Sequence, residues 1–411
     1  MTQDLGGVRV PAGPIAPAGT PSARSAAGVG RLIGLDLARG LAVFGMYAAH
    51  VGPMPTEGGV TGWVMELFHG RSSALFAVLA GLALVLIAGR RVPRTGRDGR
   101  RAAARIAIRA VVLLALGSAL TASGTVVEVI LAYYGVYFLL ALPFRRLPAR
   151  TLALAAVVWA LLGPPLLHAL SEVIYAEAMY TEDWSYRGWA ATIDGHDPLA
   201  AWSGEGVVAL LCAGGYPALT WMPYVLAGMA LGRLDLAAPA VRVRLARLGA
   251  AMAVLGYGGS WLALRLFPQA VEATGAPHAW WSDVDVDADW DTWWWLLVAA
   301  PHSQTTPSLI ANTGVALAVI AGALILVDRF APARRLARPV IAVGTMSLTA
   351  YVGHVVAVWW LDLDLTGAPL SMWLGFVGVA ALVATVWLRF FRRGPLEYLV
   401  NAATAPARHL R

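Results

Sequence analysis

Lysine is absent from this sequence, charged residues are scarce, and cysteine occurs once. All 31 basic residues are arginine, and charged residues make up 13% of the 411 residues. A soluble domain carries roughly 25% charged residues. Together with a hydrophobic share of 58% and a mean hydropathy of +0.65, this deficit indicates a chain embedded in lipid.

The single cysteine and three missing motifs exclude several kinds of chemistry. Cys212 cannot form an internal disulfide or a cysteine-rich metal site, and we interpret it as a packing residue. The sequence has no His-Glu-x-x-His, no Walker loop and no Gly-x-Ser-x-Gly. Zinc hydrolysis, nucleotide hydrolysis and serine-esterase chemistry therefore lack support. The net charge of +7 could suggest nucleic acid, but the arginines flank apolar segments, so we expect no nucleic-acid partner.

Ten apolar segments predict an all-α, polytopic membrane protein with about ten transmembrane helices. This membrane domain spans residues 31–400, with Leu199–Gly214 as a further short or re-entrant helix. Residues 1–30 are predicted to be a disordered cytoplasmic tail, and residues 401–411 a second cytoplasmic tail. The ten segments are Leu32–His50, Ser73–Gly89, Ile106–Leu120, Val126–Leu142, Leu152–His168, Tyr216–Leu231, Leu248–Phe267, Leu309–Val327, Val340–Leu361 and Met372–Phe390.

The arginines between these segments are distributed unevenly. With the N-terminus inside, only Arg71, Arg187 and Arg265 fall on the outer side. Cytoplasmic loops carry an excess of basic residues, and an error of one helix would destroy this bias. We therefore predict a multi-pass protein of a bacterial plasma membrane with both termini in the cytoplasm.

The predicted outer loops are acidic and rich in tryptophan. This composition is typical of a solvated face with an aromatic belt, or of a field that concentrates cationic amines. The run from Asp283 to Asp289 resembles a calcium loop, but Ala288 and Trp294 replace its required glycine and acidic residue. No metal is therefore predicted.

Ionisable residues inside apolar segments are expensive and are candidates for function. The first segment carries Asp36, Arg39 and His50, and their spacings of 3 and 11 residues place them on one helical face. This stripe would run from a charged pair near the cytoplasm to a histidine near the outer surface. A structural ion pair with an interfacial histidine is the alternative.

Three further histidines fall at the predicted outer level, and with His50 they are candidate catalytic residues. They are His69, His302 and His354, and we expect all four to line one acidic, Trp-lined vestibule. A neutral imidazole can take a proton near neutral pH, although any single histidine is more often structural. The polar residues predicted to bind substrate are Glu128, Tyr216, Ser303, Ser347 and Tyr351.

Six segments occur in a fixed order along the chain. They are Gly34-Leu-Asp36-Leu-Ala-Arg39-Gly40 continuing to His50, Phe68-His69-Gly-Arg71-Ser-Ser, Gly215-Tyr216-Pro217 continuing to Gly232-Arg233, Pro301-His302-Ser303, Met346-Ser347-Leu-Thr349-Ala-Tyr351 with His354, and Arg393-Gly-Pro-Leu-Glu397. As a set they resemble bacterial membrane proteins related to heparan-alpha-glucosaminide N-acetyltransferase, including the YeiB-like branch. The resemblance covers roughly residues 31 to 400.

The resemblance implies a transmembrane acyltransferase that uses cytoplasmic acyl-CoA, expected to be acetyl-CoA. Asp36 and Arg39 match the family's acid and arginine in the first helix, and with Arg71 we assign them to the acyl donor. His50 stands where the family has an asparagine. Thr61 stands where the family has its catalytic histidine, and the nearest histidine is His69.

The leading hypothesis is acyl transfer to an amine or hydroxyl acceptor at the outer face. A transporter for a small solute is the alternative, and broken helices would favour it. A third hypothesis is a non-catalytic membrane scaffold or sensor. The expected partners are membrane lipid, a small-molecule, sugar or amine acceptor and, in a homodimer, a second copy of the chain.

Overall fold

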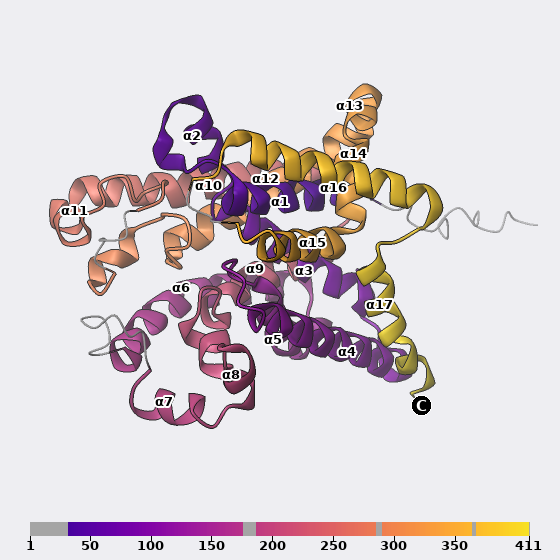
Figure 1. Ribbon diagram of the computed structural model, residues 1–411, viewed down its shortest axis with the longest axis horizontal. Helices are drawn as coiled ribbons and strands as arrows, with labels where there is room; N and C mark the ends of the chain where they lie inside the picture. The colour runs from indigo at the N-terminus through magenta and orange to yellow at the C-terminus, as the bar shows by residue number, and fades with distance from the viewer. Residues whose placement is uncertain (1–31, 176–185, 285–289, 364–366, 411) are drawn as a thin grey trace, which may run out of the picture. The chain divides into compact units, whose positions relative to one another are not determined.

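The computed structural model describes residues 32–175, 186–284, 290–363 and 367–410, and these residues form helices and connecting loops (Figure 1). The predicted tail at residues 1–30 lies outside them. The α-helices are α1 (Ile33–Val51), α2 (Gly59–Glu66), α3 (Arg71–Ala88), α4 (Gly96–Thr121), α5 (Ile130–Leu140), α6 (Ala149–Ile174), α7 (Gly188–Asp194), α8 (Pro198–Ser203), α9 (Ala218–Gly232), α10 (Pro239–Leu266), α11 (Pro268–Thr274), α12 (Thr306–Arg329), α13 (Ala331–Leu336), α14 (Arg338–Thr345), α15 (Ser347–Trp360), α16 (Leu370–Phe390) and α17 (Pro395–Ala403). Single turns lie at η1 (Pro55–Glu57), η2 (Pro143–Arg146), η4 (Ala209–Ala213), η5 (Trp293–Leu297) and η6 (Ala405–His409).

Each of the ten predicted segments overlaps a helix, but fewer helices meet the length and hydropathy of a membrane span. Among the described residues, five helices are long and apolar enough to cross a membrane, or seven if each of two bent pairs counts as one span. The bends are 97° between α10 and α11 and 86° between α14 and α15. The prediction of an all-helical, multi-pass membrane protein is confirmed. The number of ten spans and their orientation stay predictions.

Residue chemistry explains where the helices begin and end. Pro268 separates α11 from α10, since proline has no amide hydrogen to continue the helix. Gly89 ends α3 with a φ of 115°, in the left-handed region that glycine tolerates best. Thr305 accepts a hydrogen bond from the Ser308 amide at the start of α12.

Helix α1 lies at the centre of the buried core and packs against α3, α12, α14 and α16. Its contact with α14 depends on small residues. A Cβ added to Gly344 would lie 1.7 Å from the Asp36 carbonyl oxygen, and one added to Gly40 would lie 2.1 Å from the Val340 carbonyl oxygen. Small residues allow helix backbones to approach closely in membrane proteins. This contact fixes where α1 presents its polar stripe.

Two buried arginines tie loops and helices together. The Arg233 guanidinium donates to the carbonyl oxygens of Leu147, Arg90 and Arg145, and so joins the α3–α4 and α5–α6 connections. Arg242 of α10 bonds to Asp328 of α12. Each guanidinium has acceptors, as a buried cation requires.

The C-terminal residues pack against the membrane helices. Segment 401–410, expected to be a tail, completes α17 and forms η6, and the Leu410 carbonyl oxygen accepts a hydrogen bond from Arg101 Nε at 3.1 Å. Glu397 of α17 caps the start of α15, accepting from the amides of Leu348 and Thr349 at 2.8 and 3.2 Å. A carboxylate at a helix N-terminus interacts favourably with the helix dipole. The α14–α15 break is therefore held by a distant segment.

Candidate functional site

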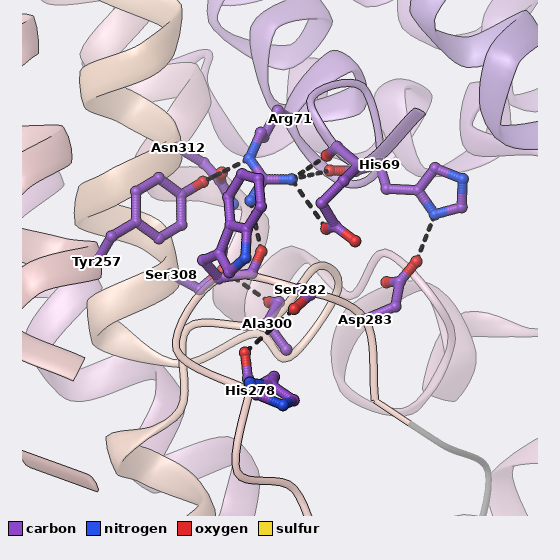
Figure 2. A network of polar contacts seen from close by, with 11 residues as sticks. His69, Arg71, Tyr257, His278, Ser282, Asp283, Ala300, Ser308 and Asn312 are labelled. Atoms are coloured by element: carbon purple, nitrogen blue, oxygen red, sulfur yellow. Dashed lines mark hydrogen bonds and ion pairs between the residues drawn. The ribbon is translucent and has the colours of Figure 1, made fainter. Parts of the chain in front are cut away.

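His69 is paired with a carboxylate from a distant loop (Figure 2). It lies in the turn between α2 and α3, and its Nδ1 is 2.5 Å from Oδ2 of Asp283, which follows α11. The two side chains are 13% and 29% exposed. Burial raises the pKa of the Asp283 carboxyl, but the hydrogen bond from His69 and the nearby positive charges outweigh it, so the net pKa is lowered. An ionised Asp283 accepts the Nδ1 proton and leaves Nε2 of His69 with a lone pair.

Arg71, two residues later, anchors this loop to the helices. Its guanidinium donates to the main-chain oxygens of Glu66 and Trp281, to the Glu66 carboxylate and to the hydroxyl of Tyr257 at 2.8 Å (Figure 2). The Tyr257 hydroxyl donates in turn to Asn312 of α12 at 2.7 Å. All three nitrogens of Arg71 thus serve the protein, and its donor-binding role stays a prediction that no contact here supports.

The other end of the polar stripe on α1 is a pair of histidines. Nδ1 of His50 and Nε2 of His354 are 2.9 Å apart, and Nδ1 of His354 is 2.5 Å from the Tyr351 carbonyl oxygen. The rings are inclined by only 6° with centroids 5.2 Å apart, which fits an in-plane hydrogen bond. A carbonyl only accepts, so His354 carries its proton on Nδ1, and His50 must donate from Nδ1. His50 therefore also keeps an unprotonated Nε2.

His302 lies in the loop before α12, with its backbone in the left-handed region at a φ of 58°. Its ring is 5.7 Å from that of Tyr216, measured between centroids. The charges of His302 and His69 both act on His50, so these histidines lie within electrostatic range of one another. A small cavity beside His302, of about 10 Å³, has room for about one water molecule. It is lined by Gly70, Trp221, Tyr224, His302, Gln304, Ser308, Leu309 and Asn312, and does not reach His50, His69 or His354.

The predicted substrate-binding residues fall into two groups. Glu128 belongs to an acidic cluster in which the hydroxyl of the buried Tyr133 lies 3.3 Å from Glu128 Oε1 and 3.2 Å from Glu205 Oε1, and its single proton can be donated to either. Burial and the neighbouring Glu128 raise the pKa of Glu205 to about 7. Tyr216 follows Gly215, where an added Cβ would lie 2.7 Å from Glu128 Oε1, so it adjoins this cluster.

Two of the remaining three candidates form hydrogen bonds within the protein. Ser303 is buried, and its hydroxyl is 3.3 Å from that of Thr305. The Tyr351 hydroxyl accepts from the Ile130 amide at 3.2 Å. Ser347 is the first residue of α15. Their substrate-binding roles stay predictions.

Asp36 and Arg39 form the expected ion pair. Arg39 Nη1 is 2.9 Å from Asp36 Oδ1, with Asp36 buried and Arg39 23% exposed. The prediction that these two charges contact each other inside the helix bundle is confirmed. Arg39 remains partly open to a ligand, while Asp36 is enclosed by the α14 contact.

Sequence reasoning missed the partners that orient the candidate histidine and its arginine. Asp283 was expected only as one of several outer acids, and Tyr257, Trp281 and Asn312 were not expected at the site. A run of Asp residues around position 283 signals an acidic loop, but its spacing cannot say which carboxylate meets His69. Where the structure describes the chain, it contains no group of three or more His, Cys, Asp or Glu residues able to hold a metal ion.

Two known families match this chain. Residues 31–264 match the family described as heparan-alpha-glucosaminide N-acetyltransferase, catalytic, and residues 286–406 match a protein of unknown function, DUF418. A search of curated proteins gave no significant match. The first region contains His50 and His69, and the second contains His302 and His354, so the His50–His354 bond joins the two. The first match covers more than half of the 411 residues, and the pairing of the two regions is typical of YeiB-like membrane proteins. The chain therefore belongs to the heparan-alpha-glucosaminide N-acetyltransferase family of multi-pass membrane proteins.

Proposed function

We propose that this protein is a membrane-bound acyltransferase that transfers an acyl group, expected to be acetyl, from acyl-CoA to an amine or hydroxyl acceptor. The His69–Asp283 pair carries the proposal, because His69 lies within the matched catalytic family region and the pair has the geometry of an oriented base. Asp283 holds the Nδ1 proton, so the His69 Nε2 lone pair can accept a proton from the acceptor. The acceptor nitrogen or oxygen then attacks the thioester carbonyl. The carbon–sulfur bond breaks, and CoA leaves as the thiol with the proton that His69 took from the acceptor.

The two ends of the site have separate tasks. Arg39, whose partner Asp36 is buried, is the candidate contact for the CoA phosphates, since guanidinium forks suit phosphate. The acidic cluster of Glu128 and Glu205 would favour a cationic amine as acceptor. Transfer from cytoplasmic donor to outer acceptor, in a plasma membrane with both termini inside, belongs to this proposal.

Replacement of His69 tests the chemical step. Purified protein in detergent is given labelled acetyl-CoA and a panel of amines and sugars, and transfer is measured. His69→Ala should lower kcat by about 10²–10⁴ because a general base acts in the chemical step. Its affinity for CoA should change little. Asp283→Asn should lower kcat less, because His69 remains but its tautomer is no longer fixed.

His278 supplies the matched control, because it is an exposed histidine of the same loop. The hydrogen bond that it accepts from the Ser282 hydroxyl goes to its main-chain carbonyl oxygen, which an alanine would keep. His278→Ala should transfer acetyl at the wild-type rate. Full activity in His69→Ala would remove this residue from the mechanism and direct attention to His50.

A small-solute transporter remains the second candidate, and the bent α14–α15 and α10–α11 pairs favour it. Transporters often bind substrate where a helix is broken. Absence of acetyl transfer to every acceptor, combined with uptake of a labelled solute into proteoliposomes, would support this alternative.

A further inference from the structure

Two arginines of α4 and one that follows α16 come together in the folded chain. Arg105 and Arg109 are one turn apart on α4 and share a face. The segment from Arg393 through α17 and η6 packs against α4 (Figure 1). Its end, at Leu410, bonds to Arg101, and the charge of Arg393 at its start opposes that of Arg109. The three arginines therefore belong to elements that pack together, and the charges of Arg393 and Arg105 both act on Arg109.

The carboxylates that lie closest in sequence to these three arginines interact with other groups. Glu397, four residues after Arg393, gives both oxygens to α15, including a 2.6 Å bond from the Thr349 hydroxyl. Asp98 lies 3.7 Å from Arg101. Across the described part of the chain, no ion pair joins a carboxylate to Arg105, Arg109 or Arg393. The positive charge of the three is therefore not balanced there.

Arg109 is half-buried on α4, and its guanidinium is less well satisfied than that of the buried Arg233. Its Nε is buried and has no hydrogen-bond partner among the described residues, whereas every guanidinium nitrogen of Arg233 donates to a carbonyl. A buried charged donor without an acceptor costs free energy, and adjacent like charges add to this cost. An anion with several oxygens would satisfy both needs at once.

We propose that Arg105, Arg109 and Arg393 form a binding site for a phosphate-bearing anion between α4 and the segment that precedes α17. Guanidinium groups bind phosphate oxygens through paired hydrogen bonds, which a single carboxylate could not offer to three arginines. The phosphates can come from the CoA part of the acyl donor, an assignment that rests on the proposed function, or from an anionic lipid headgroup.

The test uses full-length protein purified in detergent and compares Arg393→Gln, Arg109→Lys and Arg335→Gln. Arg393 is exposed, so its replacement should not disturb packing. Arg109→Lys keeps the positive charge but removes the paired N–H donors of the guanidinium group. Arg335, exposed on α13, is the control. Binding of CoA and of 3′-dephospho-CoA is measured by calorimetry, and retention of phosphatidylglycerol by lipid extraction. A thermal scan confirms that each variant is folded.

Loss of about tenfold or more in CoA affinity for Arg393→Gln, but not for Arg335→Gln, supports the site with CoA as ligand. Unchanged CoA affinity with lost phosphatidylglycerol retention supports the site with lipid as ligand. If Arg393→Gln binds both as the wild type does, the site is refuted. An acetyl-transfer assay distinguishes a failure of this site from a failure of the proposed function. If Arg393→Gln loses the phosphate site, its KM for acetyl-CoA rises and its kcat stays near that of the wild type. If the proposed function is wrong, the wild type itself transfers no acetyl group.

Discussion

Single hydrogen-bond partners decide what each candidate histidine can do. Asp283 and the Tyr351 carbonyl oxygen are both pure acceptors, and each fixes a proton on Nδ1 of the histidine it contacts. The result is that His69 directly, and His50 through His354, present an unprotonated Nε2. These two imidazoles are prepared to accept a proton without any change in side-chain position.

The His50–His354 bond can be measured by a double-mutant cycle. His50→Ala and His354→Ala should each destabilise the protein by about 1–3 kcal/mol, because each leaves a polar nitrogen in a partly buried site. The double variant should lose less than the sum, with a coupling energy of about 0.5–3 kcal/mol. Unfolding in detergent, followed by intrinsic fluorescence, checks this, and strictly additive losses would show that the two rings do not interact.

Glu205 gives a prediction for the pH dependence of stability. Its pKa is raised to about 7, chiefly by burial and then by Glu128, so the folded protein holds this proton more tightly than the unfolded chain. The associated stability is complete below pH 4.5 and is lost as the pH rises to about 7. Glu205→Gln should therefore flatten the profile of Tm against pH in this window. Above pH 7 it should stabilise the protein by on the order of 1 kcal/mol, since solvent screens part of the effect.

Thermal scans from pH 4.5 to 8 make this measurement, with Glu272→Gln, an exposed residue of α11, as the control. A Glu205→Gln profile parallel to that of the wild type would mean that Glu205 is ionised across the whole range.

At the scale of helices, close backbone contact is what positions α1. Asp36 can be buried next to Arg39 only because α14 approaches with a glycine at position 344. The α14–α15 break, capped by Glu397, then directs α15 so that His354 meets His50. Two motifs separated by about fifty residues, around Thr349 and Glu397, act together as this structural joint.

Replacing one glycine should show how strict the contact is. Gly344→Ala places a Cβ against the Asp36 carbonyl oxygen and should destabilise the protein by about 3 kcal/mol or more, since backbone cannot yield as a flexible side chain can. Gly322→Ala is the control: it is helical with open space around its Cβ, and should stabilise by up to about 1 kcal/mol. The two Tm values provide the comparison, and equal values would mean that α1 and α14 are not in contact.

For the whole molecule, the membrane orientation is open to direct test because the chain has only one cysteine. In a Cys212→Ser background, Arg335→Cys should be protected from a membrane-impermeant thiol reagent in intact cells, because positive loops are retained in the cytoplasm. Glu272→Cys should react with it. Both positions are exposed in the structure and should react after the cells are opened. Labelling of Arg335→Cys in intact cells would reverse the predicted orientation.

The sequence by itself determined the helical class, the membrane setting, the approximate helix positions and the family. These follow from local composition, because about twenty apolar residues in a row are costly anywhere but in lipid, and from short ordered motifs. It also predicted the Asp36–Arg39 pair, which is set by helical spacing alone. What only the tertiary structure decided is which distant groups meet: Asp283 with His69, and His354 with His50. Such contacts depend on loop paths and helix breaks. Several acids in one loop are equivalent in sequence, and only the folded path of that loop, which Arg71 holds at the Trp281 carbonyl oxygen, selects the one that orients a histidine.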